Sequence, residues 1–293
     1  MPALRHLLLL TAALFMVACG GRTSTLVTDT SAAEKKGDAA PLVEKGDELW
    51  KARSARASAD GAINAWEEAA STDPTRADVQ LKLAYAYYFL ANAHLRWEED
   101  NDDALLATFE KGVVAAERAI KLQSPEFAKK IKDGAGWQVA VKSVPKEGVP
   151  SLYWYATNLG KWALLDGFTT ILSHKDDVAA IMEHCKTLHE DFFYAAPHRY
   201  FGVYRTKIPF PGGDLPVSKV HFERAVELAP TYLDTKVLFA ESYAVKAQDM
   251  DLFKKLLNEV VAAKDDINPE LVPETKNSKR IAKHLLDNIE DFF

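Results

Sequence analysis

The sequence of 293 residues is poor in cysteine and lacks the common metal-binding motifs. Its two cysteines, Cys19 and Cys185, allow at most one disulfide, and neither belongs to a Cys-x-x-Cys pair. No His-Glu-x-x-His motif occurs either. Because zinc and related ions are normally held by such closely spaced ligands, we expect no metal site and no cofactor.

Charge of one sign does not accumulate along the chain. The formal net charge is −6, and no run of basic residues is longer than two. Proteins that bind nucleic acid usually carry a basic patch or stripe, so we expect no nucleic-acid partner. A composition of 48% apolar and 27% charged residues is ordinary for a soluble globular domain.

The signatures of common enzyme classes are also absent from the sequence. There is no Gly-x-Ser-x-Gly, no phosphate-binding loop ending in Lys-Ser/Thr and no dinucleotide fingerprint. His184, Cys185 and His189 are close in sequence, but adjacent residues and a partner five positions on do not converge on one helix face. We therefore expect a protein that is not an enzyme, with a hydrolase that uses the Cys185 thiol as an alternative.

The N-terminus has the layout of a bacterial export signal. Arg5 precedes a twelve-residue apolar run, Leu7–Ala18, which is too short to span a bilayer stably, and Cys19 follows directly. MVAC (Met16–Cys19) resembles a lipobox. We predict that residues 1–18 are a lipoprotein signal peptide and that Cys19 is lipidated; the alternative is an ordinary export signal with an incidental cysteine.

Residues 19–41 are predicted to be a flexible tether between the lipid and the folded domain. Gly, Ser, Thr, Asp and Lys dominate this stretch, so it can bury too little apolar surface to offset the entropy of ordering. A random coil of this length reaches on the order of 25 Å. Gly20 after the lipidated cysteine favours the periplasmic face of the outer membrane, by resemblance to lipoprotein sorting rules.

Two stretches that lie 156 residues apart share one packing pattern. Their matched residues are Trp66, Ala69, Pro74, Ala84 and Tyr87 in the first copy, and Phe222, Ala225, Pro230, Ala240 and Tyr243 in the second. A small Ala lets two helices approach closely, the aromatic fills the space beside it, and Pro ends the first helix. The sequence therefore predicts an all-α domain over residues 42–293, built from degenerate tetratricopeptide-like hairpins that stack into a compact α-solenoid.

Between the two copies, the sequence predicts further helices of different character. Asp60 is expected to cap a helix that ends at Asp73-Pro74. The glycines and prolines of Pro125–Gly148 indicate short helical turns and loops. Ser151–Leu172 is apolar on most sides, but its charged and amide side chains are too costly in lipid, so we expect a nearly buried central helix instead of a membrane span.

Pro197–Ala244 contains the densest set of polar groups beside aromatics. His198 and Arg199 are candidate donors to a carboxylate ligand, or else partners in an ion pair within the fold. Ser218 and His221, one helical turn apart, could share that surface or pack internally. The other candidate cleft residues are the aromatic Tyr204, the turn glycines Gly212 and Gly213, and Asp214, which is also expected to begin a helix before Pro216. The alternative for the two glycines is a connector between two helices.

A second candidate set lies on the predicted central helix. Trp154, Asn158 and Trp162 are four residues apart and form one stripe, with a polar amide between two indoles. They are included among the candidate cleft residues. Core packing around a hydrogen-bonded Asn is the competing interpretation.

Four segments resemble the TatT family, the T-component lipoproteins associated with tripartite ATP-independent periplasmic (TRAP) transporters. They are LYWYATNLGKWA at Leu152–Ala163, APHRYFGVY at Ala196–Tyr204, PGGDL at Pro211–Leu215 and the repeat copy at Ser218–Ala244. The resemblance covers roughly residues 42–263. It implies an all-helical periplasmic protein that associates with the solute-binding P-component.

The same resemblance implies a ring-like homotrimer whose subunits have a cleft and pore for a hydrophobic or organic-acid ligand. We therefore expect an accessory component of a TRAP-type uptake system, held to the membrane by lipid on Cys19. A scaffold for cell-envelope assembly, acting through the concave face of the helical array, is the alternative.

Overall fold

The structure is a computed structural model in which residues 22–28, 34–209 and 212–293 are described. These residues form helices, turns and loops, and none of them belongs to a strand. The prediction of an all-α fold is confirmed. Within the described ranges, no helix combines the length and the apolar character that a membrane crossing requires. The predicted signal peptide and Cys19 lie outside the described residues.

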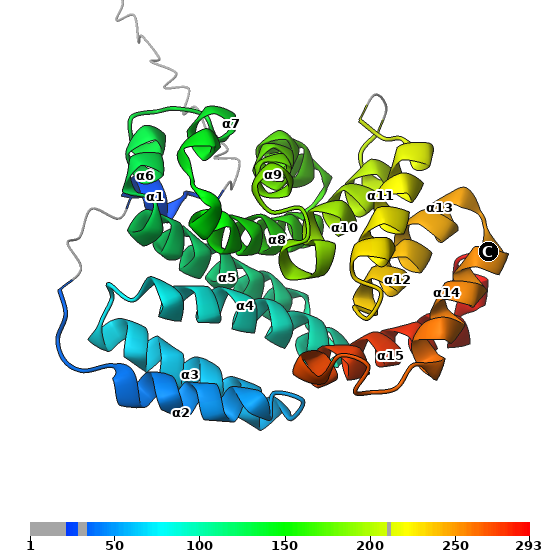
Figure 1. Cartoon of the computed structure of the whole chain (residues 1–293), viewed down its shortest axis with the longest axis horizontal. Coiled ribbons are helices and arrows are strands. Elements are labelled where there is room, and N and C mark those ends of the chain that lie inside the picture. Colours follow the sequence, from blue (N-terminus) through cyan, green and yellow to red (C-terminus); the bar gives the residue numbers. More distant parts are fainter. Residues whose placement is uncertain (1–21, 29–33, 210–211) are drawn as a thin grey trace, which may run out of the picture.

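Two helical hairpins begin the array (Figure 1). The first pairs α2 (Ala40–Lys51) with α3 (Arg56–Thr72), and the second pairs α4 (Ala77–Ala93) with α5 (Asp102–Gln123). A short 3₁₀ helix, η1 (Leu95–Trp97), lies in the connection between α4 and α5.

The N-terminus of α3 differs from the prediction. This helix begins at Arg56, so Asp60 lies one turn inside it and does not cap it. The Asp60 carboxylate accepts a hydrogen bond from Arg56 Nε at 2.7 Å. An i,i+4 ion pair on the helix surface therefore takes the place of the expected cap.

The packing motif in the first copy behaves as its spacing predicts. Ala69 and Ala84 are fully buried, so α3 and α4 approach closely. Trp66 is 2% exposed, and its indole Nε1 donates a hydrogen bond to the Val43 carbonyl oxygen at 3.3 Å. A Cβ atom on Gly46 would lie 2.3 Å from this Nε1, so α2 can approach the indole only because that residue is glycine.

The irregular middle of the chain forms short helices that pack on the first hairpins. These are α6 (Pro125–Lys132), α7 (Trp137–Ala140), η2 (Val141–Ser143) and η3 (Lys146–Gly148). Phe127 is fully buried, and the ring of Trp137 stacks on Tyr155 with 4.3 Å between ring centroids. Aromatic packing thus holds a segment that is rich in Gly and Pro.

The predicted central helix is α8 (Val149–Asp166), which packs between α5 and α9 (Phe168–Leu188). The sequence predicted one helix as far as Leu172, but the chain turns at Gly167, where φ is 130°. This conformation is open to glycine and strained for other residues. The expected long helix is therefore two helices joined by one glycine.

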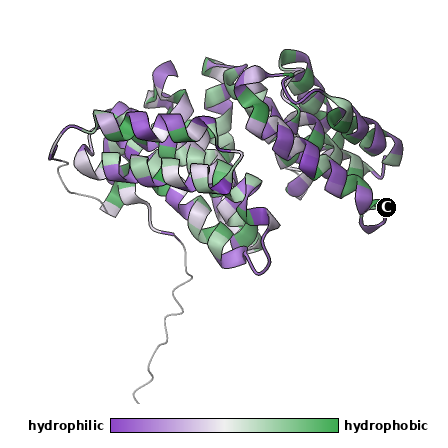
Figure 2. Cartoon of the chain, turned by 90° about the horizontal axis from the view of Figure 1, so that it is seen from below, coloured by the Kyte–Doolittle hydropathy of each residue, from purple (hydrophilic) through white to green (hydrophobic). Residues whose placement is uncertain are grey.

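The second part of the molecule repeats the hairpin arrangement less regularly. It contains α10 (Phe192–Lys207), α11 (Leu215–Leu228), α12 (Asp234–Leu238), the π-helical turn η4 (Phe239–Ala244), α13 (Val245–Ala247), α14 (Met250–Ala262), η5 (Pro269–Leu271), α15 (Val272–Asp287) and η6 (Ile289–Asp291). Most of it packs around a second core, whereas Ala196 and Phe201 of α10 belong to the core of the first part. Figure 2 shows the two parts side by side.

The last long helix returns to the first hairpins. Glu274 of α15 forms a salt bridge with Arg53 at 2.7 Å and accepts a hydrogen bond from the Tyr85 hydroxyl at 2.5 Å. Further along α15, the Arg280 guanidinium lies 4.1 Å from the ring centroid of Trp97. The chain therefore closes on itself across the space between its two cores.

The first described residues differ from the predicted flexible tether. The short helix α1 (Thr25–Thr28) packs on α5 and α6, and Leu26 is buried. Arg22 pairs with Glu117 of α5 at 2.7 Å, and both side chains are buried. Composition alone did not predict that this segment is ordered, because its docking depends on charge and hydrogen bonds more than on buried apolar area.

Candidate functional site: a two-chambered cleft

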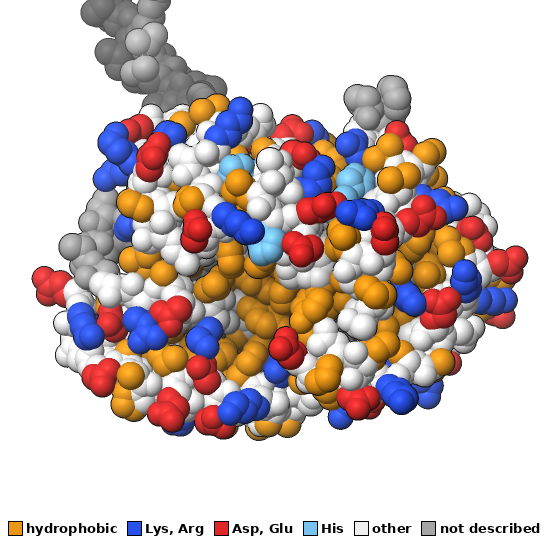
Figure 3. Space-filling view, in the orientation of Figure 1, with side chains coloured by type: hydrophobic (Ala, Val, Ile, Leu, Met, Phe, Trp, Pro, Cys, Tyr) orange, Lys and Arg blue, Asp and Glu red, His pale blue; other side chains and the backbone are white. Residues whose placement is uncertain are grey.

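A cleft lies between the two cores, where hydrophobic side chains gather in a hollow (Figure 3). It has two chambers that share the residues Tyr88, Lys161, Tyr232, Asp234 and Leu238. The larger one, here the apolar chamber, has a volume of about 180 Å³. The smaller one, here the polar chamber, has about 50 Å³.

The apolar chamber is formed by α8, α9 and α10. Its wall combines small and branched residues with the faces of aromatic rings, including Ala156, Leu164, Ile171, Val178, Val203, Ile208, Tyr153 and Tyr200. Lys175 and Lys207 also border it. A wall of this kind suits an apolar chain, with cations available for an anionic group.

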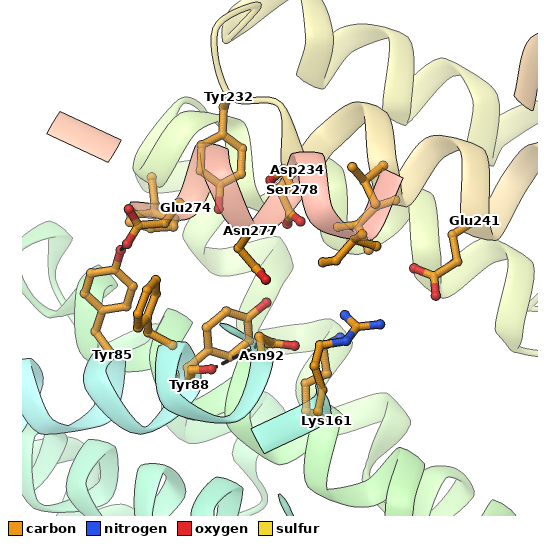
Figure 4. Close-up of a pocket in the computed structure, with 16 residues that line it drawn as sticks. Tyr85, Tyr88, Asn92, Lys161, Tyr232, Asp234, Glu241, Glu274, Asn277 and Ser278 are labelled. Carbon is orange, nitrogen blue, oxygen red and sulfur yellow. Dashed lines mark hydrogen bonds between the residues drawn. The ribbon is translucent and has the colours of Figure 1, made fainter. Parts of the chain in front are cut away.

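The polar chamber lies between α4 and the α12–η4 segment, with α15 covering it (Figure 4). Tyr85, Tyr88 and Asn92 come from α4, and Asp234 and Glu241 come from α12 and η4. The buried side-chain oxygen Oδ1 of Asn277, on α15, has no hydrogen-bond partner within the described structure. The chamber therefore offers hydrogen-bonding groups that the protein itself does not fully use.

Lys161 and Asp234 border both chambers. Burial lowers the pKa of the Lys161 ammonium, and the charge of Arg96 lowers it further. Burial raises the pKa of the Asp234 carboxyl, an effect that Arg199 and Lys161 oppose. In the described part of the chain, neither group forms a salt bridge or a side-chain hydrogen bond. Two poorly solvated charges without direct partners in a cleft are typical of a binding site.

A left-handed turn forms part of the cleft wall at the start of α10. Phe193, Tyr194 and Ala195 have φ values of 42°, 60° and 59°. Such angles cost about 1–3 kcal/mol for each residue that is not glycine, so the surroundings must hold them. Phe193 lines the polar chamber, and Tyr194 stacks on Tyr232 with 5.0 Å between centroids. The strained turn therefore positions two aromatic rings at the cleft.

Arg199 holds this turn. Its Nη2 donates a hydrogen bond to the Phe193 carbonyl oxygen at 2.9 Å, and its Nη1 donates one to the Tyr194 carbonyl oxygen. The guanidinium also lies 4.2 Å from the ring centroid of Tyr232. Arg199 borders the apolar chamber, but its guanidinium donates to backbone carbonyl oxygens and not to a carboxylate.

Tyr204 also borders the apolar chamber, whereas His198 and His221 lie outside both chambers. The two imidazoles face each other at the joint between α10 and α11, with 2.9 Å between their Nδ1 atoms, and His198 Nε2 contacts Glu190 at 3.0 Å. Burial, and then the charge of His198, lower the pKa of His221 to about 4. The pair therefore serves the packing of two helices.

Ser218 likewise differs from the predicted cleft surface. It is fully buried, and its hydroxyl donates a hydrogen bond to the Gly202 carbonyl oxygen at 2.7 Å. This bond joins α11 to α10 across the same joint that the histidines occupy. The spacing of Ser218 and His221 therefore reflects the packing of α11 on α10 and not a shared binding surface.

The turn before α11 is a connector. Asp214 caps α11, as predicted, by accepting a hydrogen bond from the Val217 amide at 3.0 Å. A Cβ atom on Gly213 would lie 2.2 Å from the Ile208 carbonyl oxygen, so the tight turn excludes a side chain there. Gly212 accepts a hydrogen bond from Arg205, and Gly213 and Asp214 border a separate depression beside Lys246. None of the three lines the two-chambered cleft.

The stripe of Trp154, Asn158 and Trp162 faces the core and not the cleft. Asn158 is fully buried, and its amide donates hydrogen bonds to the carbonyl oxygens of Ala84 and Trp154 at 3.1 and 2.8 Å. Trp154 and Trp162 are 4% and 5% exposed. The amide joins α8 to α4, so the competing core interpretation describes these residues.

Sequence reasoning missed the residues that border both chambers. Lys161 is one of the charged residues that argue against a membrane span at Ser151–Leu172. Its position next to the buried stripe was a usable signal, because a cation on a buried helix needs a polar cavity. Asp234 and Tyr232 gave no comparable signal, since they follow a helix-ending proline like ordinary loop residues.

Cys185 does not have the properties of a reactive thiol. It is fully buried in α9, and burial raises its pKa to about 12. Nucleophilic catalysis needs the thiolate, which is disfavoured in such an environment. The alternative of a hydrolase based on this residue therefore has no support. No group of His, Cys, Asp and Glu within the described ranges could hold a metal ion.

Comparison with known proteins identifies the family. The family model of the TRAP transporter T-component, TAtT, matches residues 55–293. No curated protein matches the chain. The match begins just before α3 and includes the residues on both sides of the cleft, and it agrees with the resemblance of the four sequence segments. The chain belongs to the TRAP transporter T-component family.

Proposed function

We propose that this T-component binds an amphipathic organic acid in the two-chambered cleft and exchanges it with the solute-binding P-component of a TRAP system. Family membership supports a role in transport. The observation that carries the ligand proposal is Lys161, a cation without a salt bridge in the described structure, at the junction of an apolar and a polar chamber. Its ammonium would hold the carboxylate, and the aliphatic chain would fill the apolar chamber.

Binding of octanoate to the full-length protein tests the ligand proposal, with octanol as the neutral control. Calorimetry should show that octanoate binds more tightly than octanol. Lys161→Met should weaken octanoate binding by about 10- to 100-fold, the range expected for a charged hydrogen bond. Lys142→Met, at an exposed residue outside the cleft, should leave binding unchanged. Equal affinities for octanoate and octanol would contradict the proposal.

The pH dependence of octanoate binding provides a second test. Burial lowers the pKa of Lys161, so the ammonium of the free protein is lost at a lower pH than that of an ordinary lysine. Anion affinity should therefore fall as the pH rises through this lowered value. A bound carboxylate favours the charged form, so binding should take up protons in that range. Lys161→Met should abolish the proton uptake.

The partner proposal needs a separate experiment. Pull-down of the tagged protein from native membranes should recover a TRAP solute-binding protein. Recovery of other partners without a TRAP solute-binding protein would contradict the proposed association. Native mass measurement tests the proposed homotrimer, for which the resemblance to the family is the support.

We also propose that Cys19 is lipidated and that the protein faces the periplasm from the outer membrane. The apolar run and lipobox-like MVAC at the N-terminus support this proposal. Mass spectrometry of the N-terminal peptide should show acyl groups on Cys19, and Cys19→Ser should release the protein from the membrane fraction.

A further inference from the structure

Glu117 fixes the start of the described chain to the body of the protein. Its carboxylate accepts hydrogen bonds from both terminal nitrogens of Arg22 at 2.7 Å, from the Ser24 hydroxyl at 2.7 Å, and from the amide and hydroxyl of Thr25 at 2.9 and 2.6 Å. The Glu117 side chain is 0% exposed and that of Arg22 is 4% exposed. We call this contact the Glu117 clamp. A bidentate pair shielded from water holds its geometry well.

The clamp limits how far a lipid on Cys19 could lie from the folded body. Three peptide units separate Cys19 from Arg22, and a fully extended chain of this length spans at most about 11 Å. The unclamped tether predicted from composition would reach on the order of 25 Å. A lipidated protein with an intact clamp would therefore be held with one particular edge next to the membrane.

That edge consists of α1, α6 and α7, which lie together at one side of the molecule (Figure 1). The turn η2, which carries Lys142, packs on α6 and α7, and η3, which begins at Lys146, follows it in the chain. Residues 125–148 carry five lysines and three acids in a chain whose net charge is −6. Two of the lysines form exposed pairs, Lys129 with Asp133 and Lys130 with Glu126. The other three are exposed and have no salt bridge within the described residues: Lys132, Lys142 and Lys146.

Two exposed apolar side chains accompany these lysines. Val139 of α7 is 63% exposed, and Val27 of α1 is 48% exposed. Exposed apolar groups beside lysines suit the headgroup region of a bilayer, where lysines meet phosphates and apolar side chains enter the interface. The side chains are scattered on short helices, so the edge would add orientation to a lipid anchor and would not anchor the protein alone.

We infer that the α1–α6–α7 edge rests on anionic phospholipid when Cys19 is lipidated, so that the protein sits on the membrane in one orientation. This inference depends on the proposed lipid anchor. The anchor supplies attachment, the Glu117 clamp fixes which edge is attached, and the lysines favour that edge against an anionic surface.

Two variants, each with one added cysteine, measure the orientation. Val139→Cys places a label on the inferred edge, and Val220→Cys places one on α11, where Val220 is 64% exposed. Labelling is selective because Cys185 is buried and Cys19 would carry lipid. The lipidated full-length protein is reconstituted into phosphatidylcholine vesicles with phosphatidylglycerol and an acceptor dye on the headgroups. Energy transfer should be several-fold greater from residue 139 than from residue 220.

Equal transfer from the two labels would overturn the inference, because it would mean that the body moves freely on a tether. Glu117→Gln weakens the clamp and should bring the two signals together. Combined Lys132→Gln, Lys142→Gln and Lys146→Gln, which leave the clamp intact, should lower the residue 139 signal only when phosphatidylglycerol is present. Each lysine near an anionic surface contributes about fivefold in membrane affinity. An unchanged signal in this triple variant would contradict the role of the lysines.

The same preparation separates failure of the inference from failure of the lipid anchor. A protein that lacks acyl groups and does not sediment with vesicles would refute the anchor. A protein that is acylated and sediments, but gives equal transfer from both labels, would refute the orientation alone.

Discussion

The two copies of the packing motif share their buried positions and differ where they face the cleft. Trp66 and Phe222 are both buried, and each packs against a glycine of an earlier helix, Gly46 and Gly202 respectively, again 156 residues apart. Beyond the aromatic, α4 is an uninterrupted α-helix. In the second copy the corresponding helix is α12 followed by the π-helical turn η4.

These second helices line the polar chamber from its two sides. Tyr85 of α4 and Glu241 of η4 occupy equivalent positions in the two copies, and both border that chamber. At another equivalent pair, Asp78 is exposed beside Arg76, whereas Asp234 borders the cleft without a salt bridge in the described structure. The comparison teaches that the buried motif fixes the hairpin, while the residues between its positions can change to form a site. π-helical turns often occur at functional sites, in keeping with this division.

The largest expected effect tests whether Trp66 and Phe222 contribute equally to stability through their packing. Trp66→Ala and Phe222→Ala should each lower the free energy of unfolding by about 3–5 kcal/mol, since each leaves a cavity beside a fully buried alanine. Urea unfolding followed by circular dichroism gives the measurement. Val220→Ala, at an exposed position of α11, should change stability by less than about 0.5 kcal/mol. If only one of the two substitutions lowered the free energy of unfolding, the two aromatics would not have equivalent packing roles.

The glycine pair should show a smaller effect. A Cβ atom at Gly46 would lie 2.3 Å from Trp66 Nε1, and one at Gly202 would lie 2.8 Å from the Phe222 ring. Gly46→Ala and Gly202→Ala should therefore each destabilise by about 1–3 kcal/mol through overpacking. Gly136→Ala, where no atom lies within 4 Å of the added Cβ, is the matched control for the same unfolding measurement. Stabilisation by either helix substitution would show that close approach is not required.

The aspartate pair should respond to pH in opposite directions. Burial raises the pKa of Asp234 above its ordinary 3.8, so the folded state binds the proton more tightly and stability falls as pH rises through the folded pKa. Asp234→Asn removes that penalty and should stabilise the protein by about 1 kcal/mol at pH 7. The gain should disappear below pH 3.8.

For Asp78, the hydrogen bond from Arg76 lowers the pKa, so its stabilisation is present above pH 3.8 and is lost as pH falls through the folded pKa. Its side chain is 51% exposed. Asp78→Asn should therefore cost at most about 0.5 kcal/mol at pH 7, as for other surface pairs. Unfolding curves of both variants between pH 3 and pH 8 test the comparison; parallel pH profiles would contradict it.

The last comparison concerns the final position of the motif, Tyr87 in the first copy and Tyr243 in the second. The Tyr87 hydroxyl donates a hydrogen bond to Glu67 Oε1, and burial followed by this contact raises the pKa of Tyr87. Tyr87→Phe should cost about 0.5–1.5 kcal/mol, the usual range for one hydrogen bond. Tyr243 has no such bond in the described structure, so Tyr243→Phe should be nearly neutral in the same assay. Equal costs would show that the hydroxyl at this position does not distinguish the copies.

The helical pairs could be predicted because their signal is local. Alanine and aromatic spacing reports how two neighbouring helices pack, and Trp66, Ala69 and Ala84 are buried as that spacing requires. Two segments with nearly the same sequence, ERAIKL at Glu117–Leu122 and ERAVEL at Glu223–Leu228, show the limit of local information. Glu117 of the first is a buried clamp, whereas Glu223 of the second is exposed beside Lys219. The difference depends on Arg22, which is 95 residues away from Glu117.

The cleft was harder to predict for the same reason. Arg199 and Tyr204 border it, but the turn that Arg199 holds has left-handed backbone angles at residues that are not glycine. The sequence therefore contains no signal for that turn. Lys161 and Asp234 meet only because α8 and α12 approach each other in the folded chain. Spacing along one helix identifies which residues share a face, but it does not show which faces border empty space.

The contact of Glu274 with Arg53 and Tyr85 has a mechanical consequence. It joins the final long helix to the first hairpin, so the two cores are connected both through the middle of the chain and across this contact. A rigid-body movement that widens the cleft on that side must break the contact. The rate at which a molecule enters or leaves would then depend on a latch whose arginine belongs to neither chamber, and a substitution at Arg53 could change exchange kinetics while leaving the binding surface intact.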